Sequence, residues 1–135
     1  MMGHKISLEN FEHLDTARLE ALRLLREDGK PCVLGVMADH FLDKAREWLA
    51  ETVAAGADPS ALTGAARGLK DLCGLIGAIG MRARAVDLEE AVRDGRLADT
   101  GTIIRGLHAE LCHIERLLNT YTHDCQHVGV FATPE

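Results

Sequence analysis

The stretch TGAARGLKDLCGLIGAIG, from Thr63 to Gly80, is the most informative part of this chain, because it reads as part of a helix and yet holds many glycines. The glycines are Gly64, Gly68, Gly74, Gly77 and Gly80. Each glycine inside a helix costs about 0.5–1 kcal/mol relative to alanine. A helix that keeps them indicates that something must come close to it.

A helical wheel at about 100° per residue separates this segment into two faces. The face predicted to be buried carries Leu62, Ala65, Ala66, Leu69, Leu72, Cys73 and Ile76. The face predicted to be exposed carries Gly64, Arg67, Lys70, Asp71, Gly74 and Ala78. We interpret this nearly bare face, with Arg67 at its centre, as a docking surface for another protein. The alternative is that some glycines, such as Gly68 and Gly77 at its flanks, relieve crowding between neighbouring helices.

Apolar periodicity elsewhere predicts further helices over about 15–27, 31–55, 82–93 and 99–121, and the glycine-rich helix starts at Pro59. Asp58 is the expected N-cap before Pro59, and Gly95 is the expected C-terminal stop of the fourth helix. We therefore predict an all-α fold, an up-down four-helix bundle with a short extra N-terminal helix. The whole chain, 1–135, would be one domain, with the bundle at about 10–121 and a flexible tail at 123–135.

Composition narrows the function classes. The chain has 135 residues, 47% of them hydrophobic, and a formal net charge of −6. The acidic balance and the lack of basic runs argue against binding to nucleic acid or to an anionic membrane. No apolar stretch approaches the length of a membrane span, and the N-terminus lacks an apolar signal core. We expect a cytoplasmic protein whose four cysteines are free thiols, with Cys73 and Cys112 as packing residues.

The order and spacing of several short motifs resembles the histidine-containing phosphotransfer (HPt) family. That family's signature is roughly A-H-x-L-K-G, then small or apolar residues, then G-A. This chain reads Ala66-Arg67-Gly68-Leu69-Lys70-Asp71 and then Gly77-Ala78, with Phe41-Leu42 before and Leu88-Glu89 and Gly95 after. The resemblance covers about residues 10–121. It implies a four-helix bundle with an exposed phosphoryl-accepting histidine midway along one helix, in a two-component signalling pathway.

Two signature positions depart from the family. Arg67 stands where the resemblance places the phosphorylated histidine, and Asp71 stands where the family usually has glycine. Neutral imidazole has a nucleophilic nitrogen near pH 7, whereas a guanidinium stays protonated and offers only donors. The chain is therefore expected to bind without phosphotransfer, with no enzymatic activity and no cofactor. Lys70, which in the family helps to hold phosphoryl oxygens, is retained, and Asp71 is expected to pair with Arg67.

The resemblance implies a receiver domain or a histidine kinase as partner, with this chain acting as a competitor or an adaptor. The family's receivers carry a cluster of acidic residues that normally holds a divalent cation. A fixed positive charge at Arg67 would suit such a pocket.

Other functions remain open on the sequence alone. His108 and Cys112 lie four residues apart, and the tail holds His123, Cys125 and His127, so a metal- or ligand-binding bundle is one alternative. A structural dimer built through the bare face is another. A displaced phosphoryl acceptor is disfavoured, because neither His40 nor His108 has a lysine three residues on. We predict no metal site.

Overall fold

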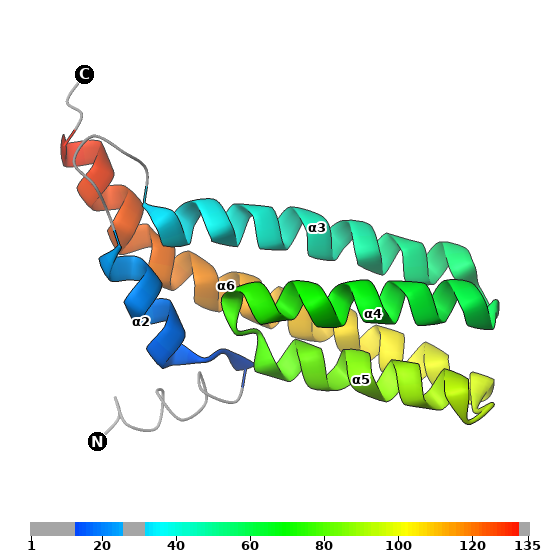
Figure 1. Ribbon diagram of the computed structural model, residues 1–135. Coiled ribbons are helices and arrows are strands. Elements are labelled where there is room, and N and C mark those ends of the chain that lie inside the picture. Colours follow the sequence, from blue (N-terminus) through cyan, green and yellow to red (C-terminus); the bar gives the residue numbers. More distant parts are fainter. Residues whose placement is uncertain (1–12, 26–31, 133–135) are drawn as a thin grey trace.

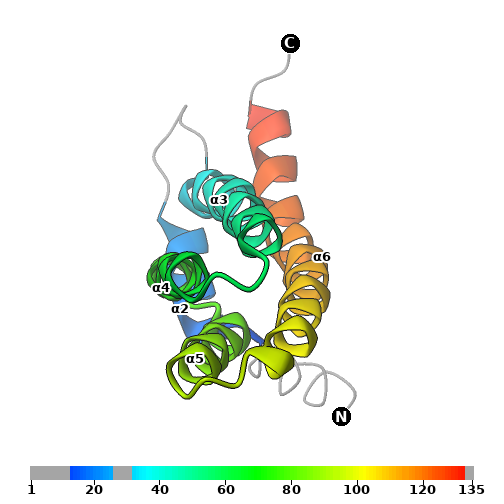
Figure 2. The same ribbon diagram turned by 90° about the vertical axis from the view of Figure 1, so that its right-hand side faces the viewer.

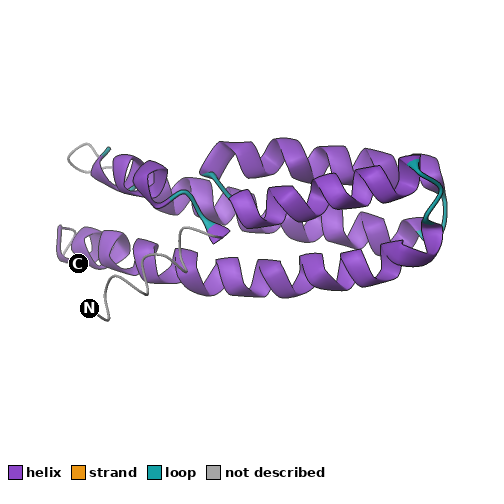
Figure 3. Cartoon of the chain, turned by 90° about the horizontal axis from the view of Figure 1, so that it is seen from below, coloured by secondary structure: helices purple, strands orange, loops and turns teal. Residues whose placement is uncertain are grey.

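The computed structural model describes residues 13–25 and 32–132, with side chains described as far as Thr122 (Figure 1). The described residues form helices and no strand, as the view of the bundle from below shows (Figure 3). The helices are α2 (Thr16–Leu24), α3 (Val33–Ala55), α4 (Pro59–Ile76), α5 (Ile79–Arg93) and α6 (Thr100–Ala132), with a short 3-10 helix, η1 (Leu97–Asp99), before α6. None of them, over the described residues, combines the length and the apolar character that a membrane span requires.

Helices α3 to α6 run alternately in opposite directions and form the predicted up-down four-helix bundle. Viewed from its end, the bundle has α3, α4, α5 and α6 at the corners of a quadrilateral (Figure 2). The short helix α2 lies across one end of the bundle, beside the turn between α4 and α5 (Figure 1). The predicted fold class, including the short N-terminal helix, is confirmed.

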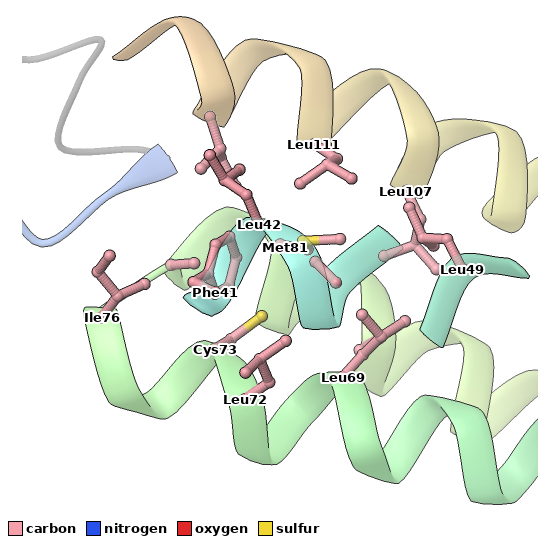
Figure 4. Close-up of a cluster of buried hydrophobic side chains, with 14 of the residues drawn as sticks. Phe41, Leu42, Leu49, Leu69, Leu72, Cys73, Ile76, Met81, Leu107 and Leu111 are labelled. Carbon is pink, nitrogen blue, oxygen red and sulfur yellow. The ribbon is translucent and has the colours of Figure 1, made fainter. Parts of the chain in front are cut away.

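Each long helix contributes one apolar face to a single core (Figure 4). The labelled core residues are Phe41, Leu42 and Leu49 from α3, Leu69, Leu72, Cys73 and Ile76 from α4, Met81 from α5, and Leu107 and Leu111 from α6. All seven residues predicted for the buried face of the glycine-rich helix are buried. The face opposite to them is therefore fixed as the outer surface of the bundle.

The helix signals read from the sequence act as expected in α4 and α5. The Asp58 side chain accepts hydrogen bonds from the backbone N–H groups of Ser60 and Ala61, and Pro59 is the first helical residue. Gly95 follows the end of α5 with φ of +76°, a conformation that favours glycine. Asp58 therefore marks the start of α4, and Gly95 marks the end of α5.

The end of the glycine-rich helix differs from the prediction. Helix α4 stops at Ile76, and Gly77 adopts the left-handed conformation, with φ of +76°. Its N–H bonds to the Cys73 carbonyl at 3.0 Å, and its own carbonyl accepts from the Asp15 N–H at 2.8 Å. A Cβ on Gly77 would also meet the Asp15 Cβ at 2.9 Å. Gly77 is therefore required by the turn and by the close approach of the segment that leads into α2.

Ala78 was predicted to lie on the exposed face, and this is wrong. It is 1% exposed and stands just before α5, which begins at Ile79 rather than near residue 82. A wheel rotates by a constant angle per residue only within one helix. Because the left-handed Gly77 ends that rotation, the angle calculated for Ala78 does not apply.

The last helix is longer than predicted. The sequence indicated an end near Tyr121 and a flexible tail at 123–135, but α6 runs to Ala132. No proline occurs between Thr100, where α6 begins, and Pro134, and extending an existing helix costs far less than starting one. Loss of apolar periodicity at residue 122 is therefore a poor marker of where this helix ends. The side chains of 123–132, including His123, Cys125 and His127, lie outside the described part.

The cysteines only partly follow the expectation. Cys73 is a buried free thiol, as expected, and burial raises its pKa to about 12. Cys112 is a free thiol but exposed, so its predicted packing role is wrong. Cys32 forms a disulfide, which contradicts the prediction that all the cysteines are free. A disulfide requires that the fold bring the Cα atoms of two cysteines within about 7 Å of each other, and spacing in the sequence does not show this.

Candidate docking face on helix α4

The outer surface of α4 carries five of the six residues predicted for the docking surface. These are Gly64, Arg67, Lys70, Asp71 and Gly74, which we call the α4 face. The side chain of Arg67 is 66% exposed and that of Lys70 is 28% exposed, while the other three residues are exposed. The α4 face therefore keeps Arg67 at its centre, with a glycine on each side along the helix.

The glycines of α4 divide into two kinds. A Cβ on Gly68 would lie 2.3 Å from a ring carbon of Trp48, so the indole of α3 packs directly on this glycine. For Gly64 and Gly74, a Cβ would meet nothing within 4 Å. Packing explains Gly68, as the crowding alternative predicted for it. Packing does not explain Gly64 and Gly74, which leave the surface bare on both sides of Arg67.

The two cations of the α4 face share one carboxylate from the neighbouring helix. The Nε of Arg67 donates to Oε2 of Glu89 at 2.8 Å, and the Nζ of Lys70 donates to Oε1 of the same residue at 2.9 Å. Glu89 comes from α5 and its side chain is 13% exposed. The site is thus a triad of two positive charges and one negative charge across the α4–α5 interface.

The predicted pairing of Arg67 with Asp71 is wrong. Among the described residues, the carboxylate that binds Arg67 is Glu89, and no hydrogen bond or ion pair joins Asp71 to Arg67. A cation followed four residues later by an acid is the less favourable order along a helix, and aspartate is the shorter acid. Glu89 reaches both cations from a second helix. Asp71 remains an exposed negative charge beside them.

The two cations change the acidity of Glu89. Hydrogen bonds from Arg67 and then from Lys70 lower its pKa from 4.5 to about 2, which outweighs the opposing effect of partial burial. Glu89 is therefore ionised throughout the neutral and mildly acidic range, and the triad keeps a net charge of +1.

This shift predicts a stability difference between wild type and Glu89→Gln that depends on pH. Because the folded pKa lies below the ordinary value, the ionised carboxylate stabilises the fold above about pH 4.5, and this contribution is lost as the pH falls towards 2. We expect Glu89→Gln to lower the free energy of unfolding by about 1 kcal/mol at pH 7, a modest value because Arg67 is exposed. Urea unfolding at pH 7 and pH 2 measures the difference, which should shrink at the lower pH. A difference that is equal at both pH values would contradict this assignment.

The sequence does not indicate the role of Glu89, although the Leu88-Glu89 pair is part of the motif resemblance. Nor does it indicate a second polar cluster, in which Glu110 of α6 is 4% exposed and shares a 2.6 Å hydrogen bond with Nδ1 of His13. Arg84 of α5 lies 3.5 Å from the other oxygen of Glu110. His13 and Glu110 are 97 residues apart in sequence, so no periodicity or spacing relates them. This cluster fixes the segment before α2 to the bundle.

The candidate metal ligands do not gather. His108 and Cys112 are both exposed, and within the described residues no group of three or more His, Cys, Asp or Glu side chains is placed to hold a metal ion. The His123, Cys125 and His127 side chains lie outside the described part, so that portion of the metal alternative is untested.

Comparisons with known proteins bear on this architecture. No family model and no curated protein sequence matches the chain. Among solved structures, the crystal structure of histidine-containing phosphotransfer protein B (HptB) from Pseudomonas aeruginosa PAO1 is similar, with a TM-score of 0.72 and 27% sequence identity. The match covers 83% of this chain and 96% of that one. This chain therefore has the fold of a histidine-containing phosphotransfer protein.

Proposed function

We propose that this chain binds a receiver domain or a histidine kinase of a two-component pathway through the α4 face, without accepting a phosphoryl group. It would act as a competitor of an active phosphotransfer protein or as an adaptor. The observation that carries the proposal is Arg67, exposed at the centre of the α4 face, where the motif resemblance places the acceptor histidine. The similarity to HptB supports a role in phosphorelay signalling.

The chemistry of Arg67 argues against phosphoryl acceptance. Its guanidinium is protonated at physiological pH and has no lone pair available for attack on phosphorus. Lys70 donates to Glu89, so its ammonium serves an internal carboxylate. Arg67 is therefore suited to hold an acidic group of a partner, and unsuited to accept a phosphoryl group.

The shape of the α4 face supports close docking. Gly64 and Gly74 have open space above them. Each lowers the stability of the helix relative to alanine, and no close packing contact offsets this loss. An approaching protein surface would meet backbone and short side chains around a single projecting arginine. Because Ala78 is buried, the face is shorter than the sequence suggested, and it ends near Gly74.

Phosphorylation assays test the proposal directly. Incubation with a phosphorylated receiver or an active kinase, followed by intact mass measurement at neutral pH, should show no acid-labile phosphoryl adduct, whose mass is about 80 Da. The matched control is Arg67→His combined with Asp71→Gly, which restores the family's signature and should gain phosphoryl acceptance from the cognate donor.

Four outcomes would count against the proposal. A stoichiometric phosphoryl adduct on any histidine of the wild type would contradict the claim that the chain accepts no phosphoryl group. Failure to bind any receiver or kinase of the native organism would contradict the claim that it binds such a partner. Stoichiometric metal in protein purified without added metal, or a stable dimer that buries the α4 face, would favour the metal-binding or structural alternative.

A further inference from the structure

The arrangement of Arg67 on Glu89 leaves part of the guanidinium unused. Arg67 donates through Nε, and no described residue accepts a hydrogen bond from its Nη1 or Nη2. The side chain is 66% exposed, so these two groups, with four N–H donors, are available to a partner. Glu89 thus binds one edge of the guanidinium and leaves the other free. It does not block the site.

We propose that Glu89 is a positioning residue for partner binding, which holds Arg67 by its Nε and so presents Nη1 and Nη2 to a carboxylate of the receiver's acidic pocket. This inference rests on the proposed function and adds a residue to the same site. Glu89 would act through Arg67, without touching the partner's pocket itself.

Three features of Glu89 suit this role. It belongs to α5, a different helix from Arg67, and its side chain is 13% exposed, so it is a firmer support than an exposed acid on α4 would be. Its second oxygen binds Lys70 at 2.9 Å, which fixes the carboxylate from both sides. An arginine held in one orientation loses less side-chain freedom when it binds, and a planar fork suits bidentate contact with a carboxylate.

A positioning role and a purely electrostatic role of Glu89 predict opposite effects of Glu89→Gln on receiver binding. Glu89→Gln raises the net charge by one, so a purely electrostatic effect would tighten binding to an acidic pocket. Loss of positioning would weaken binding. We expect Glu89→Gln to weaken receiver binding about fivefold to tenfold, within the range of coupling between contacting residues. The matched control is Glu90→Gln, one residue along α5, which removes the same charge from a side chain that faces Arg93 at 4.0 Å.

Isolated receiver domains of the native organism, produced singly and titrated by interferometry, provide the probe. Glu90→Gln should leave the dissociation constant within about twofold of wild type, in line with a rim charge. Glu89→Asp keeps the charge and shortens the side chain by one methylene, so it should also weaken binding. In an Arg67→Ala background, Glu89→Gln should no longer weaken binding, because the residue through which it acts is absent. Circular dichroism confirms that each variant is folded.

The outcomes separate the two proposals. If wild type binds a receiver but Glu89→Gln binds equally or more tightly, positioning is wrong and the proposed function stands. Equal weakening by Glu89→Gln with and without Arg67 would also overturn positioning, because Glu89 would not act through Arg67. If wild type binds a histidine kinase but no receiver, positioning towards a receiver is wrong and the proposed function stands. If wild type binds neither, the failure is that of the proposed function itself.

Discussion

Arg67→Ala is expected to weaken binding of the receiver by about 2–5 kcal/mol, which is the loss expected when one partner of a desolvated charge pair is truncated. This corresponds to at least about a 30-fold rise in the dissociation constant. The physical reason is that docking on the α4 face would bury the guanidinium of Arg67, whose side chain is 66% exposed in the free protein, against carboxylates of the partner. Calorimetric or interferometric titration against the identified partner measures the loss.

Two further variants of the α4 face test its shape and charge. Gly74→Gln adds bulk without charge at a position with open space around it, so it should weaken binding while leaving the fold intact. Asp71→Ala should strengthen binding or leave it unchanged. The reason differs from the one that the sequence indicated, since Asp71 is not paired with Arg67 and would act only as a negative charge facing an acidic partner. If Arg67→Ala and Gly74→Gln both bind like wild type, the α4 face is not the docking surface.

Gly68→Ala is expected to destabilise the fold, by about 1–3 kcal/mol, as overpacking of a close contact does. The new methyl would lie 2.3 Å from Trp48, so the indole would have to move away from α4 and expose apolar surface. The matched controls are Gly64→Ala and Gly74→Ala in the same helix. Each fills open space, and each should raise the free energy of unfolding by about 0.5–1 kcal/mol. Urea unfolding followed by circular dichroism compares the three.

Opposite signs in these variants would establish that the glycines of α4 are kept for two different reasons. A lower free energy of unfolding for all three variants would show that Gly64 and Gly74 also serve the fold, and the case for a bare docking surface would weaken. A higher free energy of unfolding for Gly68→Ala would show that Trp48 moves aside without loss of stability. Packing against Trp48 would then not explain why residue 68 is a glycine.

The fold could be predicted because its signals are local. The apolar face of α4 follows from helical periodicity, and Asp58 and Gly95 act through backbone groups within a few residues of themselves. The misplacement of Ala78 has the same origin. A left-handed glycine looks like any other glycine in the sequence, and the carbonyl of Gly77 is bound by the Asp15 N–H, which lies 62 positions earlier. Only the folded chain shows which of the five glycines ends the helix.

The candidate site was predictable in part. The exposure of Arg67, Asp71 and the two open glycines follows from the wheel, because it concerns one helix. The partner of Arg67 depends on how α5 is rotated against α4, and the sequence does not give this rotation. A rule for residues four apart therefore selected Asp71, whereas Glu89, 22 residues further on than Arg67, binds it in the folded chain. The disulfide of Cys32 escaped prediction because it depends on which cysteine the fold brings next to it.

The packing of Trp48 on Gly68 gives the protein an intrinsic optical probe. Trp48 is the one tryptophan in the chain, so its fluorescence is free of overlap from other indoles. It lies against the residue next to Arg67 in sequence, on the flank of α4 that meets α3. Emission wavelength and quenching therefore report on the environment of α4 without any attached dye, and titrations of this face can be followed with the unmodified chain.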